Sequence, residues 1–164
     1  MTTWPLQSEC DSFYGNPRVP NGLVSPAWFK ANIVTISPPF RMTFDGKPVS
    51  KVQVHRKCAD SLSRVFNAIW TASGHNQVVI EQWGVDKFGG SFNYRLKRGL
   101  SSLSMHAYGC AIDFDPERNG LGVMRGHLRD CPLVIAAFKA EGWSWGGDWQ
   151  TRPDPMHFQA ARVS

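Results

Sequence analysis

One stretch of the chain has a clear helical periodicity, and it constrains the fold more than any other feature. From Ala59 onward, apolar residues recur every three or four positions, as they do on the buried face of a helix. They are Leu62, Val65, Phe66, Ile69 and Trp70. Asp60 stands in the first turn and Gly74 just past the end, which are favourable places for an acidic residue and a glycine. The sequence therefore predicts an amphipathic helix between these two positions.

Most of the other predicted elements are short strands. Asn32–Ile36 alternates as a strand and ends before Pro38 and Pro39. Asp45-Gly46 is a hairpin turn signal, and we expect it to join strands at Arg41–Phe44 and Lys51–His55. The further predicted strands are Val78–Trp83, Gly109–Phe114, Trp143–Trp145 and Met156–Val163, and a second short helix is predicted over Pro132–Ala140, ended by Gly142.

This pattern predicts an α+β fold with a small antiparallel sheet and flanking helices. A length of 164 residues suits one domain, and we expect a single catalytic domain over 1–164. Residues 1–27 are dense in proline and glycine, which predicts an irregular N-terminal arm packed by Trp4, Phe13 and Tyr14. Residues 84–104 are rich in Gly, Ser and Arg, as expected of a long functional loop.

Composition narrows the class of protein. Apolar residues make up 42% and charged residues 19%, which indicates a folded chain. The net charge of +5 favours association with polyanions, but the densest basic stretch, Arg95–Arg98, is short, so we expect no nucleic-acid partner. No charged-then-apolar leader opens the chain, and no apolar run approaches the ~20 residues of a membrane span. We therefore expect synthesis in the cytoplasm without a signal peptide, and no stable insertion into a membrane.

The cysteines do not form a recognisable motif. The chain has four, Cys10, Cys58, Cys110 and Cys131, and none belongs to a C-x-x-C pair. This spacing disfavours a thiolate zinc cluster and a redox motif, so we expect buried free thiols. Cys110 adjoins a chemically interesting segment, but strand alternation turns it away from that segment's reactive side.

Two segments of the chain each combine a histidine with carboxylates. The first runs from Ser104 to Asp113 and contains His106; the second contains Asp154 and His157. A catalytic zinc needs three N or O ligands and an open position for water, and two histidines with one carboxylate satisfy that need. On spacing alone, the alternative that these histidines are ordinary core or surface residues stays open.

The ligand assignment depends on the local geometry that we expect. Gly109 allows a tight bend after His106, so that a following strand can bring Asp113 back to face the imidazole. Asp115 would share that strand face and is the rival ligand. Pro153 and Pro155 oppose a helix, so the segment from Asp154 to His157 should be a loop that enters a strand. His55, His75 and His127 have no ligand-like neighbours, and we expect ordinary surface or half-buried histidines there.

Further residues fit the roles of an amide hydrolase. Asp154 is the candidate general base for a zinc-bound water, and Arg95 is a candidate donor to the developing oxyanion. Candidate substrate-binding residues are Tyr94, Ser104, Asp148 and Trp149. Aromatic residues here, including Trp145, fit either stacking on a ligand or packing in the core.

These segments resemble the zinc peptidases that include the D-Ala-D-Ala carboxypeptidases and dipeptidases and the phage L-alanyl-D-glutamate endolysins. The family pattern S-x-H-x-x-G-x-A-x-D fits from Ser104 to Asp113, and G-W-x-W-G-G-D-W followed by D-x-x-H fits from Gly142 to His157. The resemblance covers roughly residues 50–163, and Phe13–Pro17 looks like the opening of phage relatives. It implies a fold like that of the hedgehog and D-Ala-D-Ala metallopeptidases.

The resemblance also implies the roles of single residues. By it, His106, Asp113 and His157 bind Zn²⁺, Asp154 is the base as in the phage endopeptidases, and Arg95 stabilises the transition state. The dipeptidase branch more often has Glu beside a Trp-His pair, which this chain lacks, and this departure disfavours a dedicated dipeptidase.

The resulting expectation is a phage or prophage endolysin that hydrolyses an amide in the murein peptide stem, with the L-alanyl-D-glutamate bond as the expected target. We expect a monomer without a separate wall-binding domain, released to the cell wall by a holin-type pore-former. The alternatives are a D-Ala-D-Ala carboxypeptidase and, in a different class, a non-catalytic zinc-stabilised wall-binding or virion module.

Overall fold

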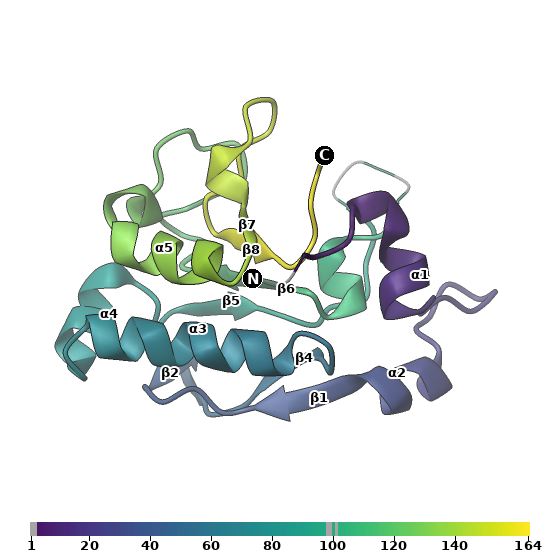
Figure 1. Cartoon of the computed structure of the whole chain (residues 1–164), viewed down its shortest axis with the longest axis horizontal. Coiled ribbons are helices and arrows are strands. Elements are labelled where there is room, and N and C mark those ends of the chain that lie inside the picture. Colours follow the sequence, from purple (N-terminus) through teal and green to yellow (C-terminus); the bar gives the residue numbers. More distant parts are fainter. Residues whose placement is uncertain (1–2, 98–99, 101) are drawn as a thin grey trace.

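The computed structural model describes residues 3–97, 100 and 102–164, and it confirms the α+β class. The α-helices are α1 (Cys10–Tyr14), α2 (Pro26–Asn32), α3 (Ala59–Ala72), α4 (Gln77–Trp83) and α5 (Pro132–Ala140). Short 3-10 helices are η1 (Gln7–Glu9), η2 (Met105–Tyr108), η3 (His127–Asp130) and η4 (Gly146–Asp148). The strands are β1 (Ile33–Ile36), β2 (Met42–Phe44), β3 (Lys47–Val49), β4 (Val52–His55), β5 (Phe88–Gly90), β6 (Ala111–Phe114), β7 (Ser144–Trp145) and β8 (His157–Gln159). Figure 1 shows α3 and α5 running beside the main sheet.

That main sheet has four antiparallel strands in the order β5-β6-β8-β7. Its central strands, β6 and β8, come from segments that lie far apart in the sequence. Alternation along β6 sends Ile112 and Phe114 to one face and Asp113 to the other. The sheet therefore has a core face and a face available for chemistry.

Aromatic packing fixes the core face of the sheet on α3 and α5. Phe114 of β6 packs edge-on against Phe66 of α3, with ring centroids 6.4 Å apart. Phe158 of β8 stacks on Phe138 of α5 at 3.9 Å. All four rings are buried. Burying a phenylalanine side chain contributes roughly 1.5–3 kcal/mol, so this cluster holds β6 and β8 in place.

The predicted helix from Ala59 is confirmed as α3, and its predicted face is the buried one, although Trp70 is only partly buried. The strands at 32–36 and 109–114 and the helix at 132–140 are confirmed to within one or two residues. The strands predicted over Trp143–Trp145 and Met156–Val163 form, but β8 is much shorter than predicted.

The predicted hairpin is wrong in its second strand. Asp45-Gly46 does make the turn, with Asp45 at φ 51° and Gly46 at φ 78°. However, β2 pairs with β3, whereas β4 pairs with β1 across the sequence. The tight turn leaves Lys47–Val49 opposite β2, so Lys51–His55 lies too far along the chain to be its partner.

The predicted strand over Val78–Trp83 is wrong, because these residues form α4. Asn76 caps the helix by accepting a hydrogen bond from the Val78 N–H at 2.9 Å, and Gly84 ends it with a left-handed φ of 79°. Only Ile80 is buried, and Val78 is 60% exposed. The residues of the apolar run thus point in different directions on a short surface helix, and one of them reaches the core.

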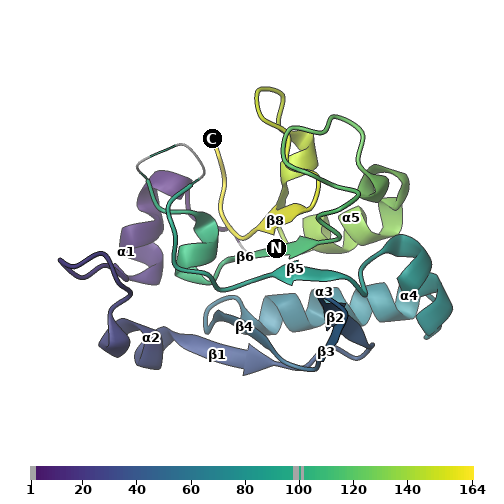
Figure 2. The same cartoon turned by 180° about the vertical axis from the view of Figure 1, so that it is seen from behind.

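The N-terminal arm is more regular than predicted. It contains η1, α1 and the start of α2, and both Trp4 and Tyr14 are buried. The Tyr14 hydroxyl donates to the Ala160 carbonyl at 2.6 Å, and the Gln7 N–H donates to the Arg162 carbonyl at 2.9 Å. Figure 2 shows α1 beside the C-terminal segment. The arm is therefore built into the core, next to the end of the chain.

Two further expectations can be compared with the structure. The four cysteines are buried and free, as predicted. The long loop predicted at 84–104 includes residues 98, 99 and 101, which lie outside the described residues; the described part is only partly irregular, because it contributes β5 to the main sheet. Among the residues that the structure describes, every helix is too short or too polar to span a bilayer.

Candidate metal centre

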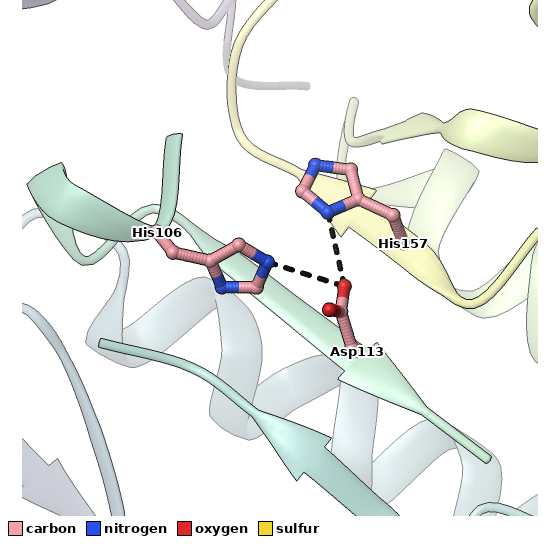
Figure 3. Close-up of side chains that lie close together, drawn as sticks. All are labelled: His106, Asp113 and His157. Atoms are coloured by element: carbon pink, nitrogen blue, oxygen red, sulfur yellow. Dashed lines mark hydrogen bonds and ion pairs between the residues drawn. The ribbon is translucent and has the colours of Figure 1, made fainter. Parts of the chain in front are cut away.

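Asp113 and His157 face each other across the two central strands of the main sheet. They are register partners in the β6–β8 pair, and the Asp113 Oδ1 lies 3.0 Å from the His157 Nδ1 (Figure 3). Directly opposed side chains on antiparallel strands have their Cβ atoms only about 4.5–5.5 Å apart. Strand pairing therefore brings together two side chains that are 44 positions apart in the sequence.

The short helix η2 adds His106 to this pair. Ser104 caps η2, since its hydroxyl oxygen accepts a hydrogen bond from the His106 N–H at 3.2 Å. Gly109 ends it at φ 73°, so the predicted tight bend is present. The chain then returns as β6, which leaves the His106 Nε2 3.2 Å from the same Asp113 Oδ1. One ligand atom from each of the three residues lies within 4.8 Å of the others.

The hydrogen bonds of His106 leave one nitrogen with a lone pair directed at Asp113. The His106 Nδ1 lies 2.6 Å from the Ser91 carbonyl oxygen. A carbonyl can only accept, so Nδ1 carries the proton in the neutral ring. Among the described residues, the buried Nε2 has no hydrogen-bond partner. A buried acceptor without a partner is costly, and a bound cation would satisfy it.

The same reasoning applies to His157 at its other nitrogen. The Gln159 amide donates to the Ala161 carbonyl at 3.1 Å, which turns its oxygen toward the His157 Nε2 at 2.8 Å. Nε2 therefore carries the proton of the neutral imidazole, and Nδ1 offers a lone pair to Asp113. A histidine that ligates a metal commonly donates its other N–H to a carbonyl or carboxylate in this way.

The electrostatics of the cluster match a cation site. Burial alone would raise the pKa of Asp113, but the facing His106 and His157 outweigh it and hold that pKa well below its ordinary value. Burial likewise acts to lower the pKa of His157, and the Asp113 carboxylate reverses this and raises it. The cluster thus favours positive charge at its centre. Two imidazole nitrogens and one carboxylate oxygen fit a catalytic zinc, which keeps a fourth position for water.

The cluster forms one wall of a hollow of about 270 Å³. Among the predicted functional residues, the structure brings four more into its lining, namely Arg95, Ser104, Trp149 and Asp154. The Asp154 Oδ2 lies 4.0 Å from the His157 Nδ1. The Trp149 ring is half-buried and packs against His157 with ring centroids 5.6 Å apart. The candidate base and the candidate oxyanion donor therefore share one hollow with the candidate ligands.

Asp154 is positioned by the glycine-rich η4. Its N–H donates to the Gly146 carbonyl at 2.8 Å, and a Cβ at Gly146 would collide with the Asp154 carbonyl oxygen. The His157 N–H in turn donates to the Asp154 carbonyl at 3.0 Å, so a turn connects the two residues. The expectation of a loop entering a strand is confirmed.

Two predicted substrate-binding residues lie elsewhere. Asp148 is exposed, pairs with Lys139 at 2.7 Å, and is not among the described residues that line the hollow. Tyr94 is partly buried against the hydrophobic core and is likewise outside that lining. Trp145 is buried, and its indole N–H donates to the Pro155 carbonyl at 2.8 Å. Of the two readings of this tryptophan, core packing is the correct one.

The rival ligand and the remaining histidines have other partners. Asp115 accepts from the Arg118 guanidinium at 2.5 Å, and the cluster contains Asp113 instead. His75 stacks on Trp70, and the half-buried His127 contacts the Gln82 carbonyl, as expected of ordinary histidines. His55, by contrast, is fully buried, so its expected surface or half-buried position is wrong.

Sequence reasoning missed the residues that support the site. Gln159 stands two positions after His157 on β8, so strand alternation puts both on one face, and this was a usable signal. The Ser91 carbonyl is a backbone group, so no residue type in the sequence indicates its contact with His106. Lys97 and Arg152 also line the hollow, but their loops gave no pattern that pointed there.

A comparison with known families agrees with this site. Residues 98–160 match the family model described as D-alanyl-D-alanine carboxypeptidase. The match spans less than half of the chain, but it contains His106, Asp113, Asp154 and His157 and stops short of Arg95. The chain is therefore similar to this family over the part that holds the candidate metal centre.

Proposed function

We propose that the protein is a zinc-dependent peptidase that hydrolyses an amide bond in the peptide stem of peptidoglycan. The observation that carries the proposal is the convergence of two imidazole lone pairs and the Asp113 carboxylate on one point at the wall of a hollow. His106, Asp113 and His157 would hold the ion. The family match supports the reaction class and the wall substrate.

Zinc bound at this point would lower the pKa of a coordinated water towards ~7 and polarise the scissile carbonyl. Asp154 lines the same hollow, close to His157. Its carboxylate accepts the proton of the attacking water and then delivers it to the leaving amine. The contact between Gly146 and the Asp154 backbone holds that carboxylate in position.

Two further groups bind the carbonyl oxygen that becomes negative during attack. The Arg95 guanidinium lines the hollow and can donate two N–H groups to it. The Ser104 hydroxyl oxygen accepts from the His106 N–H, which leaves the hydroxyl proton to donate to the substrate. Trp149 offers an aromatic wall to the peptide.

The bond that we propose is L-alanyl-D-glutamate, which makes the protein an endolysin of phage or prophage origin. It would reach the wall after a pore-former opens the membrane, and act as a monomer. A second candidate is the D-Ala-D-Ala carboxypeptidase, which the description of the matching family favours.

Digestion of purified peptidoglycan followed by mass spectrometry tests the function. Wild-type protein should release stem fragments with D-glutamate at a new amino terminus. A chelator should stop this release, and added zinc should restore it. Release of D-alanine alone would favour the carboxypeptidase. Fragments that form equally in chelator would contradict a zinc peptidase.

Asp154→Asn separates an enzyme from a zinc-stabilised binding module. The variant should keep zinc and its fold but lose cleavage by a factor of about 10²–10⁴. Asp148→Asn is the matched control, because it makes the same change at an exposed carboxylate that pairs with Lys139 outside the hollow. No fragments from wild type with zinc bound would instead indicate the binding module.

A further inference from the structure

The N-terminal arm lines a hollow of its own next to the one at the candidate metal centre. This second hollow has a volume of about 530 Å³. Gln7, Lys97, Met105 and Val163 line both hollows, so these residues form the ridge between them. The two hollows together therefore offer a ligand more room than the metal centre alone.

Lys97 is the charged residue of this ridge. Its ammonium donates a hydrogen bond to the Gln7 side-chain oxygen at 2.7 Å, across 90 positions of sequence. Gln7 belongs to η1, whose backbone is tied to the end of the chain through Arg162. The arm thus fixes the direction of the Lys97 side chain.

The charge of Lys97 is not balanced by a carboxylate. Within residues 3–97, 100 and 102–164, none of the ion pairs includes Lys97. The remaining residues are Met1, Thr2, Arg98, Gly99 and Ser101, which bring no acidic side chain. Burial lowers the pKa of Lys97, so the ammonium is partly dehydrated. A neutral amide is its only side-chain partner in the described structure.

Other charges extend this preference for anions. Arg95 and Arg152 line the same hollow as Lys97. The two carboxylates of the hollow, Asp113 and Asp154, lie together at His157. A cation at the metal centre would offset them. The hollow at the metal centre therefore attracts negative charge in a substrate.

We propose that Lys97, oriented by Gln7, is a specificity residue that binds a free carboxylate of the substrate beside the metal centre. This inference rests on the proposed function, because the carboxylate would belong to a peptide that the metal centre cleaves. A stem peptide carries such carboxylates on D-glutamate and on a dibasic residue such as diaminopimelate. Both offer the same chemistry to an ammonium group.

Steady-state cleavage of paired peptides by the zinc-loaded full-length protein tests the proposal. One pair has the D-glutamate α-carboxylate free or amidated, and a second pair has the diaminopimelate carboxylate free or amidated. Wild type should prefer the free acid of one pair by about tenfold or more in kcat/KM, since a charged hydrogen bond is lost on amidation. The pair that shows the preference identifies the carboxylate.

Lys97→Gln should abolish that preference, with the change mainly in the KM of the free-acid peptide. Lys57→Gln is the matched control. Lys57 also holds the arm, because its ammonium donates to the Phe13 carbonyl at 2.7 Å, but it lines neither hollow. This control should keep the wild-type preference.

Equal kcat/KM for free and amidated peptides in wild type, or an unchanged preference in Lys97→Gln, would overturn the proposal. An equal loss on both peptides would do the same, since it indicates only an anchor for the arm. If wild type cleaves none of the peptides, the proposed function fails. Calorimetric binding of the same peptides then decides: selective binding of the free acid, lost in Lys97→Gln, supports the subsite, and equal or no binding overturns it.

Discussion

The Asp113 carboxylate and the His157 imidazole lie directly opposite each other on adjacent strands, with Oδ1 3.0 Å from Nδ1. Neither group reaches this geometry through a flexible loop. The aromatic packing of Phe114 and Phe158 against Phe138 fixes the two strands from behind. The core therefore preorganises the candidate metal centre, and changes to its residues should be measurable as changes in metal binding.

Zinc should stabilise the folded chain through Asp113. At a free zinc concentration about 100-fold above Kd, binding adds ~2.7 kcal/mol and should raise Tm by about 5–10 °C. Asp113→Asn removes the only carboxylate of the three-residue cluster and should abolish most of this shift in differential scanning fluorimetry. Asp148→Asn, at an exposed position, should retain it. The same zinc-induced shift in both variants would exclude Asp113 as a ligand.

Gln159 should control zinc affinity without touching the ion. Its amide oxygen holds the His157 proton on Nε2, which keeps Nδ1 free to bind a metal. Gln159→Met removes this acceptor, so competition with a chromogenic chelator should give about 10–100-fold weaker zinc binding. Gln53→Met makes the same change at an exposed position on β4 and serves as the control. Equal affinities of Gln159→Met and wild type would show that the tautomer is set by another group.

The candidate site was predictable because local signals mark it. His106 precedes Gly109, whose left-handed conformation turns the chain back into β6, and His157 follows a segment with two prolines that excludes a helix. Spacing within each segment could therefore place its residues on a loop and a strand. The pairing of β6 with β8, which joins the halves, is a long-range contact that no local pattern predicted. The resemblance implied only that His106, Asp113 and His157 bind one ion.

The errors in the predicted fold have common physical causes. A short apolar run such as Val78–Trp83 fits a strand or a helix equally well. The N-cap at Asn76 stabilises the helix, and the prediction did not take it into account. The N-terminal arm was predicted to be irregular because it is dense in proline and glycine. Its helices are nevertheless stabilised by contacts with the distant Ala160 and Arg162. Likewise, the contact between Gln7 and Lys97 spans the chain and has no local signature.

His55 should make stability dependent on pH. Burial, aided by Arg56 and Lys57, lowers its pKa to about 4, although the hydrogen bond to the Tyr14 carbonyl acts in the opposite direction. In the unfolded chain its pKa is ~6.5. Below pH 6.5 the unfolded state therefore binds a proton that the folded state excludes, and stability falls as pH drops towards 4. The loss is about 3 kcal/mol on full protonation of both states.

Urea denaturation of the chelator-treated protein between pH 7.5 and 4.5 measures this effect. At neutral pH His55 stabilises the fold, because Nδ1 accepts from the Lys57 N–H at 3.1 Å and Nε2 donates to the Tyr14 carbonyl at 2.9 Å. His55→Gln should thus be less stable than wild type at pH 7.5, and the difference should shrink as pH falls. A difference that stays constant over this range would refute the assignment to His55.

Gly146 should be needed for catalysis but not for zinc. A Cβ at this position would collide with the Asp154 carbonyl oxygen and come within 3.0 Å of the Asp154 Cβ. Gly146→Ala should therefore displace the candidate base, and a shift of 1 Å can cost about 10²-fold in rate. The three ligand residues lie on η2, β6 and β8, so zinc affinity should change little.

Gly120→Ala is the matched control, because its new Cβ would meet only ordinary contacts, the nearest at 3.5 Å. Peptidoglycan cleavage and chelator competition, measured on both variants, check the prediction, and full activity of Gly146→Ala would show that this contact does not position Asp154.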